Sequence, residues 1–237
     1  MLKLRQDEAS TVRQFPRSVV MSALGWLVSF GLIASTGNVI TFDNAPLGKT
    51  PPGWTVAMTD QGSAPRWEIL KDTSAPTQPY VLAQVSRDPH PDRWPLAILN
   101  GPAVRDGDIS VRLKPVSGRE DQIGGLVFRY RDSKNFYAVR ANALDKDVTI
   151  YKVENGRCMP ILPRGMPADD FAIKHDIQPN AWAILKVSFR GGHFQVYVNH
   201  RRLLRAEDST FTGPGKVGVM TVADSVTYFD DFRVYPK

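Results

Sequence analysis

The chain has 237 residues, of which 42% are apolar and 23% are charged, and its net charge is +6. These proportions are typical of a globular protein and exclude a largely disordered chain, and one all-β domain can reach this length. Lysine and arginine are interleaved with aspartate and glutamate instead of forming a basic cluster, which argues against a nucleic-acid partner.

Residues 18–34 form an uncharged apolar run that follows Arg13 and Arg17 and leads into small residues ending at Gly37. A basic segment, an apolar segment and small residues in this order form the pattern of a secretory signal. The run has about 17 residues, near the lower limit for crossing a bilayer, so an uncleaved membrane anchor is the alternative. We therefore predict a leader at residues 1–37 and export to the periplasm or the extracellular space, with membrane attachment only through an uncleaved leader.

Residues 38–237 are predicted to form one all-β domain. Short segments rich in β-branched and aromatic residues alternate with clusters of Gly, Pro, Asn and Asp, which is typical of strands joined by turns. The predicted strands are 66–71, 80–86, 95–100, 107–115, 123–131, 136–143, 147–153, 182–190, 193–199, 202–206, 215–222 and 226–235.

The clearest pair of strands is 182–190 with 193–199, because apolar residues recur at every second position. These residues are Ala183, Leu185, Val187 and Phe189 in the first strand, and Phe194, Val196 and Val198 in the second. Side chains alternate between the two faces of a strand, so this set is expected to face the core.

Two glycine-containing sequences favour tight hairpin turns: Gly191-Gly192 between the strands of that pair, and Asn155-Gly156 earlier in the chain. Residues 163–179 have the weakest strand pattern. We expect either a long surface loop there or a short helix at 169–175.

Several motifs occur in an order that resembles the concanavalin A-like sandwich domains, laminin-G-like modules among them. They are Phe42-Asp43, Gly53-Trp54, the run Trp182-x-x-Leu185-x-Val187-x-Phe189-x-Gly191-Gly192-x-Phe194-x-Val196-Tyr197-Val198-Asn199, Gly215-x-Val217-Gly218, and Tyr228-Phe229-Asp230-Asp231-Phe232-Arg233-Val234-Tyr235. The resemblance spans about residues 40–235 and implies a two-sheet antiparallel β-sandwich of the jelly-roll kind. Members of this superfamily usually continue with Asn-Gly after the long run. Here His200 follows Asn199, so the next turn is expected to differ.

Within this superfamily, the segment 123–130, followed by Asn135-Phe136-Tyr137, looks most like the bacterial 3-keto-disaccharide hydrolase-type domains. The superfamily also contains lectins, polysaccharide-binding modules and glycosidases, so the fold does not fix the function. The resemblance implies a carbohydrate or glycoside as partner and requires no cofactor.

Catalytic carboxylates are not evident in the sequence. Glycoside hydrolysis needs two of them about 5–10 Å apart, and glucanases of this superfamily carry them on one strand as Glu-x-Asp-x-x-Glu or similar. The glutamates after the leader are far apart and form no such element: Glu68, Glu120, Glu154 and Glu207. Cys158, the single cysteine, is expected to be a small buried apolar residue and not a catalytic thiol. Whether the protein is an enzyme stays open.

The predicted hairpin of 123–131 and 136–143 supplies the main candidate site. If Leu126 and Phe128 face the core, Arg129 should share the opposite face with Arg140 and Asn142, because opposite residues of an antiparallel pair lie on one side. Two arginines so close together need neighbouring acids or a bound polyhydroxylated or anionic ligand. The alternative is a surface ion-pair network that contributes little.

Three further groups complete the candidates. Asp145 and Asp147, two residues apart, would share a strand face or belong to a solvated turn. Trp94 could stack on a sugar ring or pack a loop onto the sandwich. By resemblance to the glucanases, Asp43 and Asp230 could tie the first strand to the last through a structural calcium, although calcium needs more oxygen ligands than two carboxylates supply.

Three functions are therefore compatible with the sequence. The first is an exported carbohydrate-binding domain with Arg129, Arg140, Asn142, Asp145 and Trp94 at its ligand site. The second is a glycoside hydrolase or lyase of the 3-keto-disaccharide hydrolase type. The third is a structural domain of the cell envelope that binds a partner.

Overall fold

The computed structural model describes residues 38–237, and the predicted leader lies outside the described residues. Within this range sixteen β-strands form two antiparallel sheets of eight strands each. None of the described segments forms a helix of the length and apolarity that a membrane span requires.

Sheet A contains the final strand of the chain near its centre. Its order is β14 (Arg201–Glu207), β13 (His193–Val198), β12 (Ala183–Arg190), β6 (Gly107–Ser117), β16 (Val226–Pro236), β4 (Tyr80–Gln84) and β3 (Trp67–Lys71), with β1 (Asn38–Ile40) also paired to β16.

Sheet B carries the hairpins of the middle of the chain. Its order is β10 (Arg157–Pro160), β9 (Asp147–Glu154), β8 (Asn135–Asn142), β7 (Ile123–Asp132), β15 (Lys216–Met220), β5 (Trp94–Leu99) and β2 (Trp54–Thr59), with β11 (Ile173–Lys174) also paired to β9.

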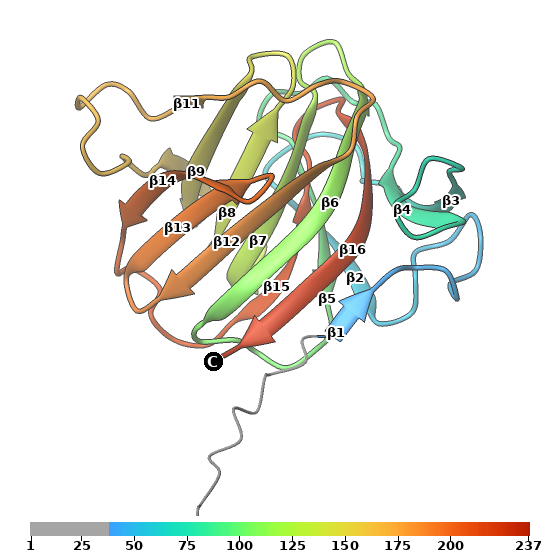
Figure 1. Ribbon diagram of the computed structural model, residues 1–237, viewed down its shortest axis with the longest axis horizontal. Coiled ribbons are helices and arrows are strands. Elements are labelled where there is room, and N and C mark those ends of the chain that lie inside the picture. Colours follow the sequence, from blue (N-terminus) through green and yellow to red (C-terminus); the bar gives the residue numbers. More distant parts are fainter. Residues whose placement is uncertain (1–37) are drawn as a thin grey trace, which may run out of the picture. The chain divides into compact units, whose positions relative to one another are not determined.

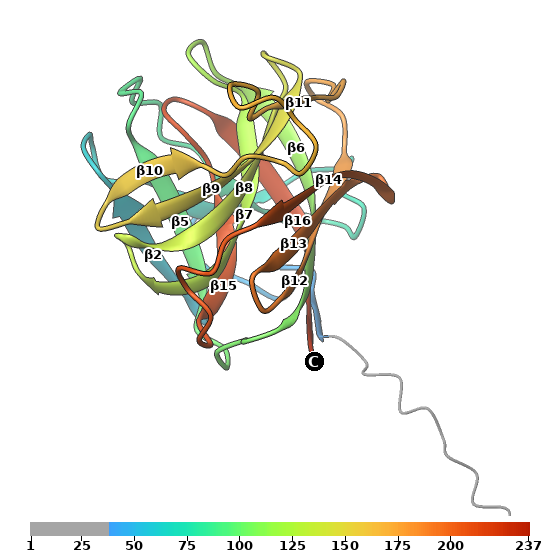
Figure 2. The same ribbon diagram turned by 90° about the vertical axis from the view of Figure 1, so that its left-hand side faces the viewer.

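The two sheets stack face to face. Figure 1 looks onto sheet A, where β6 and β16 run side by side between β12 on one side and β4 on the other. Figure 2 shows the sandwich from its side, with β7, β8, β9 and β10 in one layer and β12, β13 and β14 in the other. Each sheet therefore has an inner face toward its partner and an outer face away from it.

The main core lies between the inner faces and follows from the alternation of side chains along the strands. In β12 and β13 the register pairs Val187 with Val196 and Phe189 with Phe194, and all four side chains are buried in this core. The predicted inward set of this hairpin is therefore confirmed from Leu185 onward, whereas Ala183 is half-buried and lies outside this core. The phenyl ring of Phe194 also packs against Phe128 of β7 at a centroid distance of 5.2 Å, which joins the two sheets.

The predicted turns are present, and one has an unusual residue. Asn155 and Gly156 join β9 to β10 with φ values of 53° and 84°. Asn199 and His200 join β13 to β14 with φ values of 46° and 67°. Two successive positive φ values are typical of the tight hairpin turn that usually takes glycine at its second position. His200 adopts this conformation in place of the glycine, so the expectation that this turn would differ is wrong.

Two expectations are corrected by the structure. The segment 163–179 contains the short strand β11 at Ile173–Lys174 and no helix at 169–175, because β11 pairs with β9 at Asp147 and Val148. The opening motif Phe42-Asp43 lies just after β1 and not within a strand, and Phe42 has a φ of 68°. Besides β1, the predicted strands missed β2, β10 and β11.

Candidate functional site

The outer face of sheet B carries a second apolar cluster. It is formed by side chains that alternate with those of the main core on β5, β7, β8, β9 and β15, together with the residues that follow β15: Trp94, Leu96, Ile98, Ile123, Val127, Phe136, Ala138, Val153, Met220, Val222 and Ala223. Leu96 and Val127 are completely buried, although no second sheet formed by residues 38–237 covers this side. This face therefore has a dry apolar floor, with larger side chains packed over it.

On this face, the ring of Tyr151 contacts both an aromatic side chain, Trp94, and a cationic one, Arg140. The indole ring of Trp94 packs edge-on against the ring of Tyr151, with 5.3 Å between the ring centroids. The guanidinium of Arg140 lies over the ring of Tyr151, with its Cζ 5.2 Å from the ring centroid. A guanidinium at this distance from an aromatic ring is attracted to it. Tyr151 is thus held between Trp94 and Arg140.

Arg140 stands between two small residues. In the register of the strands it lies opposite Gly125 of β7 and Thr149 of β9. Gly125 cannot be larger, because a Cβ there would lie 2.4 Å from the carbonyl oxygen of Val139 and 2.5 Å from the sulfur of Met220. The Nε of Arg140 is buried and has no hydrogen-bond partner among the described residues. Arg140 therefore offers donor capacity that its own chain does not use.

Carboxylates surround this arginine at the end of the sheet. Asp147 is 5% exposed, and its Oδ1 is buried without a hydrogen-bond partner in the described chain. Burial raises the pKa of Asp147, and the charge of Arg140 acts against that rise. Burial also raises the pKa of Asp121 to about 6, while Arg140 lowers it and Asp145 raises it further. The site thus places one unpaired donor beside acids that resist ionisation.

Asn142 organises these acids. Its Nδ2 donates to Asp121 Oδ1 at 3.0 Å and to Asp145 Oδ2 at 2.8 Å, and its Oδ1 accepts from the amide of Leu144 at 3.0 Å. Both hydrogens of the amide nitrogen are used, and the side chain is fully buried. Asn142 therefore lies in the site as a positioning residue, while Asp145 is exposed in the turn that follows β8.

Arg129 does not share this face, which corrects the expected pairing of the two arginines. The chain carries one extra residue in β7 between the pairs Val127–Gly218 and Tyr130–Lys216, and Arg129 has a φ of 50° in this bulge. A bulge of one residue reverses the side to which the following side chains point. Arg129 thus turns into the sandwich, and Tyr130 joins the outer cluster.

The buried guanidinium of Arg129 has structural partners. It donates to the carbonyl oxygens of Arg105 at 3.1 Å and Phe211 at 2.6 Å, and to Asp106 Oδ1 at 3.2 Å. Gly215 makes room for the bulge, because a Cβ there would lie 2.4 to 2.8 Å from the backbone of Arg129. With a fully buried side chain, Arg129 holds loops together at one end of the sandwich.

Trp94 reaches the predicted face in a different role. It begins β5 and is 5% exposed, so it packs edge-on against Tyr151 and has little surface to offer a sugar ring. Tyr151 and Thr149 were missing from the sequence-based site. The signal was present, because both follow Asp147 at intervals of two in a predicted strand and so share its face.

Asp43 and Asp230 lie close enough for their charges to interact, but each carboxylate already accepts a hydrogen bond from a backbone amide. The amide of Tyr80 donates to Asp43 Oδ1 at 3.1 Å, and the amide of Thr77 donates to Asp230 Oδ2 at 2.8 Å. Burial raises the pKa of Asp230 to about 6; hydrogen bonds from the amides of Thr77 and Asp231 oppose this rise, and the charges of Asp231 and Asp43 add to it. Residues 38–237 contain no group of three or more His, Cys, Asp or Glu side chains that could hold a metal. This donor set does not fit a calcium ion, which needs more oxygen ligands.

Cys158 lies at the edge of the apolar cluster on sheet B. Burial, together with the charges of Asp60 and Asp92, raises the pKa of its thiol to about 12. A thiol with so high a pKa forms almost no thiolate near neutral pH, so Cys158 is unsuited to nucleophilic catalysis.

Taken together, these side chains can recognise a polyhydroxylated ring. Sugar hydroxyls both donate and accept hydrogen bonds, which matches an unpaired guanidinium nitrogen next to an unpaired carboxyl oxygen. The Tyr151 ring supplies an apolar surface beside them.

No family model and no curated protein matches the chain. Solved structures do resemble it. The carbohydrate binding module CBM66 from Bacillus subtilis aligns with a TM-score of 0.59 and 21% identity, over 80% of this chain and 99% of that one. The GH43 protein BlXynB from Bacillus licheniformis aligns with a TM-score of 0.56 and 15% identity, over 84% of this chain and 39% of that one.

Domain 4 of AbnA, an extracellular GH43 arabinanase from Geobacillus stearothermophilus in complex with arabinotriose, aligns with a TM-score of 0.50 and 14% identity, over 84% of this chain and 93% of that one. At such identities the likeness shows the fold alone. The predicted fold class, an all-β sandwich of two antiparallel sheets with a galectin-like or concanavalin A-like arrangement, is confirmed.

Proposed function

We propose that this protein binds a neutral glycan on the outer face of sheet B. The observation that carries the proposal is that two buried polar atoms near the ring of Tyr151, Arg140 Nε and Asp147 Oδ1, have no hydrogen-bond partner among the described residues. Buried polar groups are nearly always hydrogen-bonded in folded proteins, so an unpaired donor and acceptor on an outer face indicate a missing partner.

The charge of the site favours a neutral ligand over an acidic one. Arg140 and Lys174 are accompanied by Asp121, Asp145 and Asp147, so an added carboxylate would meet three acids and two cations. Like charges at close range are unfavourable in a partly buried setting. A neutral sugar avoids this cost and still satisfies both unpaired atoms.

The similar structures support this proposal through what their names state. One is a carbohydrate binding module, and another is a domain solved with arabinotriose. The second belongs to an extracellular enzyme, which agrees with an exported location for this chain. The glycan itself is to be identified by screening neutral oligosaccharides.

The test is to compare variants of the full chain on the oligosaccharide that binds best in that screen. Arg140→Ala removes one charged hydrogen bond and should weaken binding by about tenfold to a hundredfold. Arg140→Lys keeps the charge but loses the planar fork, so it should weaken binding as well. Lys134→Ala, in an exposed turn, is the matched control and should bind like the unaltered protein.

Isothermal titration calorimetry gives the affinities, and a thermal melt checks that each variant is folded. Unchanged affinity in both folded Arg140 variants would place the binding site elsewhere.

A glycoside hydrolase, including the 3-keto-disaccharide hydrolase type, is the second candidate because of Asp121. A carboxyl group with a pKa of about 6 is suited to act as a general acid near neutral pH. If the protein is a hydrolase, Asp121→Asn should abolish the hydrolysis of disaccharides or of their 3-keto derivatives, while the binding of these substrates persists. If the unaltered protein binds these substrates but does not hydrolyse them, the hydrolase proposal is wrong and only the binding function stands.

A further inference from the structure

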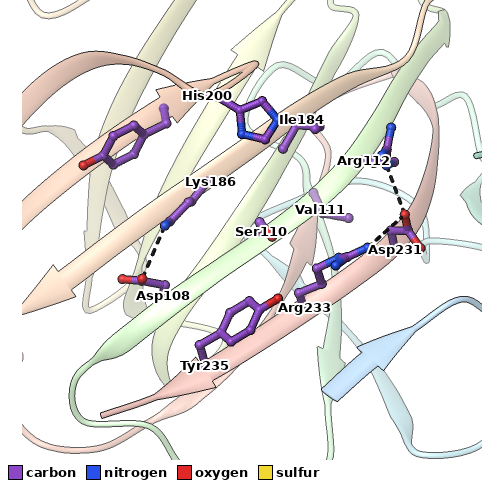
Figure 3. Close-up of a pocket in the computed structure, with 11 residues that line it drawn as sticks. Asp108, Ser110, Val111, Arg112, Ile184, Lys186, His200, Asp231, Arg233 and Tyr235 are labelled. Carbon is purple, nitrogen blue, oxygen red and sulfur yellow. Dashed lines mark hydrogen bonds and ion pairs between the residues drawn. The ribbon is translucent and has the colours of Figure 1, made fainter. Parts of the chain in front are cut away.

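A separate hollow lies on the outer face of sheet A, on the opposite side of the sandwich from Arg140. It has a volume of about 580 Å³ and lies over the adjacent strands β13, β12, β6 and β16. Figure 3 shows its lining, with Lys186 and Asp108 on one side and Arg112, Asp231 and Arg233 on the other. Five charged side chains therefore line the hollow, together with apolar and aromatic ones such as Ile184 and Tyr235.

The strand register explains why a hollow forms there. Tyr197 pairs with Lys186, Lys186 with Ser110, and Ser110 with Arg233, so the four side chains form one row across four strands. The backbones of neighbouring strands lie about 4.8 Å apart, so the Cα atoms of Lys186 and Arg233, two strands apart, are about 10 Å from each other. The short side chain of Ser110 between these two long cations leaves a groove.

Cations outnumber acids in and beside this groove. Asp231 pairs with both Arg112 at 3.0 Å and Arg233 at 3.4 Å. Asp108 pairs with Lys186 at 3.3 Å, and also with Arg190 at 2.9 Å. Four cations therefore share two carboxylates, which leaves two positive charges uncompensated within the cluster.

The acids lie deep and the cations lie at the surface. The side chains of Asp231 and Asp108 are 7% and 18% exposed, whereas those of Arg112, Lys186 and Arg233 are 39%, 40% and 38% exposed. Burial alone would raise the pKa of Asp108, but a hydrogen bond with Ser188 and the charges of Lys186 and Arg190 hold that pKa below its usual range. A molecule entering the groove thus meets mainly N–H donors over a layer of ionised acids.

The shapes of the exposed groups narrow the class of ligand. Arg112 and Arg233 contact Asp231 through Nε and Nη2 respectively, so each guanidinium has further N–H groups for a second acceptor. A guanidinium fits a planar carboxylate with two parallel hydrogen bonds. Tyr197 and Tyr235 also line the hollow, and their rings offer apolar surfaces that can pack on a sugar ring.

We propose that the groove formed by Arg112, Lys186 and Arg233 on sheet A is a second glycan site, which binds an acidic polysaccharide through its carboxylates. This site is independent of the neutral-glycan site on sheet B and differs from it in the sign of its charge. The protein then has two faces that bind two chemically different glycans.

Polygalacturonate tests the proposal, and its fully methyl-esterified form is the matched probe because it has the same backbone without the charges. The full chain should bind polygalacturonate, lose this binding as salt screens the charges, and fail to bind the ester. Lys186→Ala and Arg233→Ala each remove one exposed cation and leave the acid with its other partner, so folding is kept. Each should weaken binding by about fivefold, and the double variant by about twenty-fivefold. Lys134→Ala is the charge-matched control and should bind normally.

Several outcomes would overturn the proposal. Equal binding of the ester and the acid would remove the role of the carboxylates. Unchanged affinity in the folded double variant would place the acidic ligand elsewhere, and tighter binding of double-stranded DNA or of phosphatidylglycerol vesicles would show that the groove serves another kind of anion. Because Lys186→Ala should leave neutral-glycan binding intact and Arg140→Ala should leave polygalacturonate binding intact, failure at one face can be distinguished from failure at the other.

Discussion

The two outer faces of this sandwich differ in their apolar content and in how their polar groups are paired. On sheet B the outer face is apolar and buried in its middle, and Arg140 and Asp147 at one end keep polar atoms without partners. On sheet A the outer face is charged, and its cations and acids already pair with one another around an open hollow. One face lacks hydrogen-bond partners, whereas the other has partners but an excess of positive charge.

This difference shows which property of each face can select a ligand. Unpaired buried groups favour a ligand that supplies hydrogen bonds, and three acids against the two cations Arg140 and Lys174 disfavour an anion. Exposed ion pairs contribute little to stability, so a charge excess like that on sheet A acts on ligands more than on the fold. The same period-two alternation in two sheets thus produces two different surfaces.

The largest expected effect separates two arginines that sequence analysis placed on one face. Arg129→Ala removes a buried guanidinium from two carbonyl oxygens and Asp106 and should lower the free energy of unfolding by about 3–5 kcal/mol. Arg140 lies on the partly exposed outer face, so Arg140→Ala should lower the free energy of unfolding by about 1 kcal/mol or less. Urea denaturation followed by tryptophan fluorescence measures both values. Equal losses in the two variants would mean that Arg140 also has a structural role.

The second prediction compares the apolar content of the two outer faces. Leu96→Ala on sheet B creates a cavity in a fully buried cluster and should lower the free energy of unfolding by about 2–5 kcal/mol. Ile184→Ala is its counterpart on sheet A, where the side chain is partly exposed, and should cost about 1 kcal/mol. The same urea titration applies. If Leu96→Ala proved as mild as Ile184→Ala, the floor of sheet B would be exposed in solution.

The smallest effect concerns pH and has opposite signs for Asp121 on sheet B and Asp108 on sheet A. Burial raises the pKa of Asp121 on sheet B to about 6, so the folded state holds this proton more tightly than the unfolded state. Stability from this group is complete below its ordinary pKa and is lost as the pH rises through about 6. Lowering the pH from 7 to 5 should therefore stabilise the protein by about 1 kcal/mol for Asp121, discounted for its partial exposure. Asp230, also raised to about 6, adds in the same direction.

The control for this effect is Asp121→Asn, which should reduce the gain between pH 7 and pH 5 by about half. Asp108 on sheet A should behave in the opposite way. Its pKa is lowered, despite burial, by Ser188, Lys186 and Arg190, so its contribution is present above the ordinary pKa and is lost in more acidic solution. Melting temperatures measured at pH 7 and pH 5 give the Asp121 effect, and measurements continued below pH 4 give the Asp108 effect. A variant that kept the full gain would show that Asp121 ionises normally in the folded protein.

Much of the fold could be predicted because its signals are local. Leu185, Val187 and Phe189 recur at every second position, and alternation along a strand alone assigns them to one face. The Asn155-Gly156 turn is equally local, because glycine adopts positive φ without steric cost. Arg140 and Asn142 were placed on one face by the same rule, and Asp145 was identified beside them.

By itself, then, the sequence determined the all-β class, most of the strands, the inner face of the β12–β13 hairpin and the shared face of Arg140 and Asn142. The tertiary structure decided the rest. The bulge at Arg129 depends on Gly215 of a distant segment, whose missing Cβ admits the backbone of Arg129, and this one extra residue reverses the direction of the side chains that follow. The row of Tyr197, Lys186, Ser110 and Arg233 likewise exists only once four strands from separate parts of the chain are in register. Alternation along one strand is set by the geometry of neighbouring residues, whereas register between strands is set by the packing of the whole sandwich.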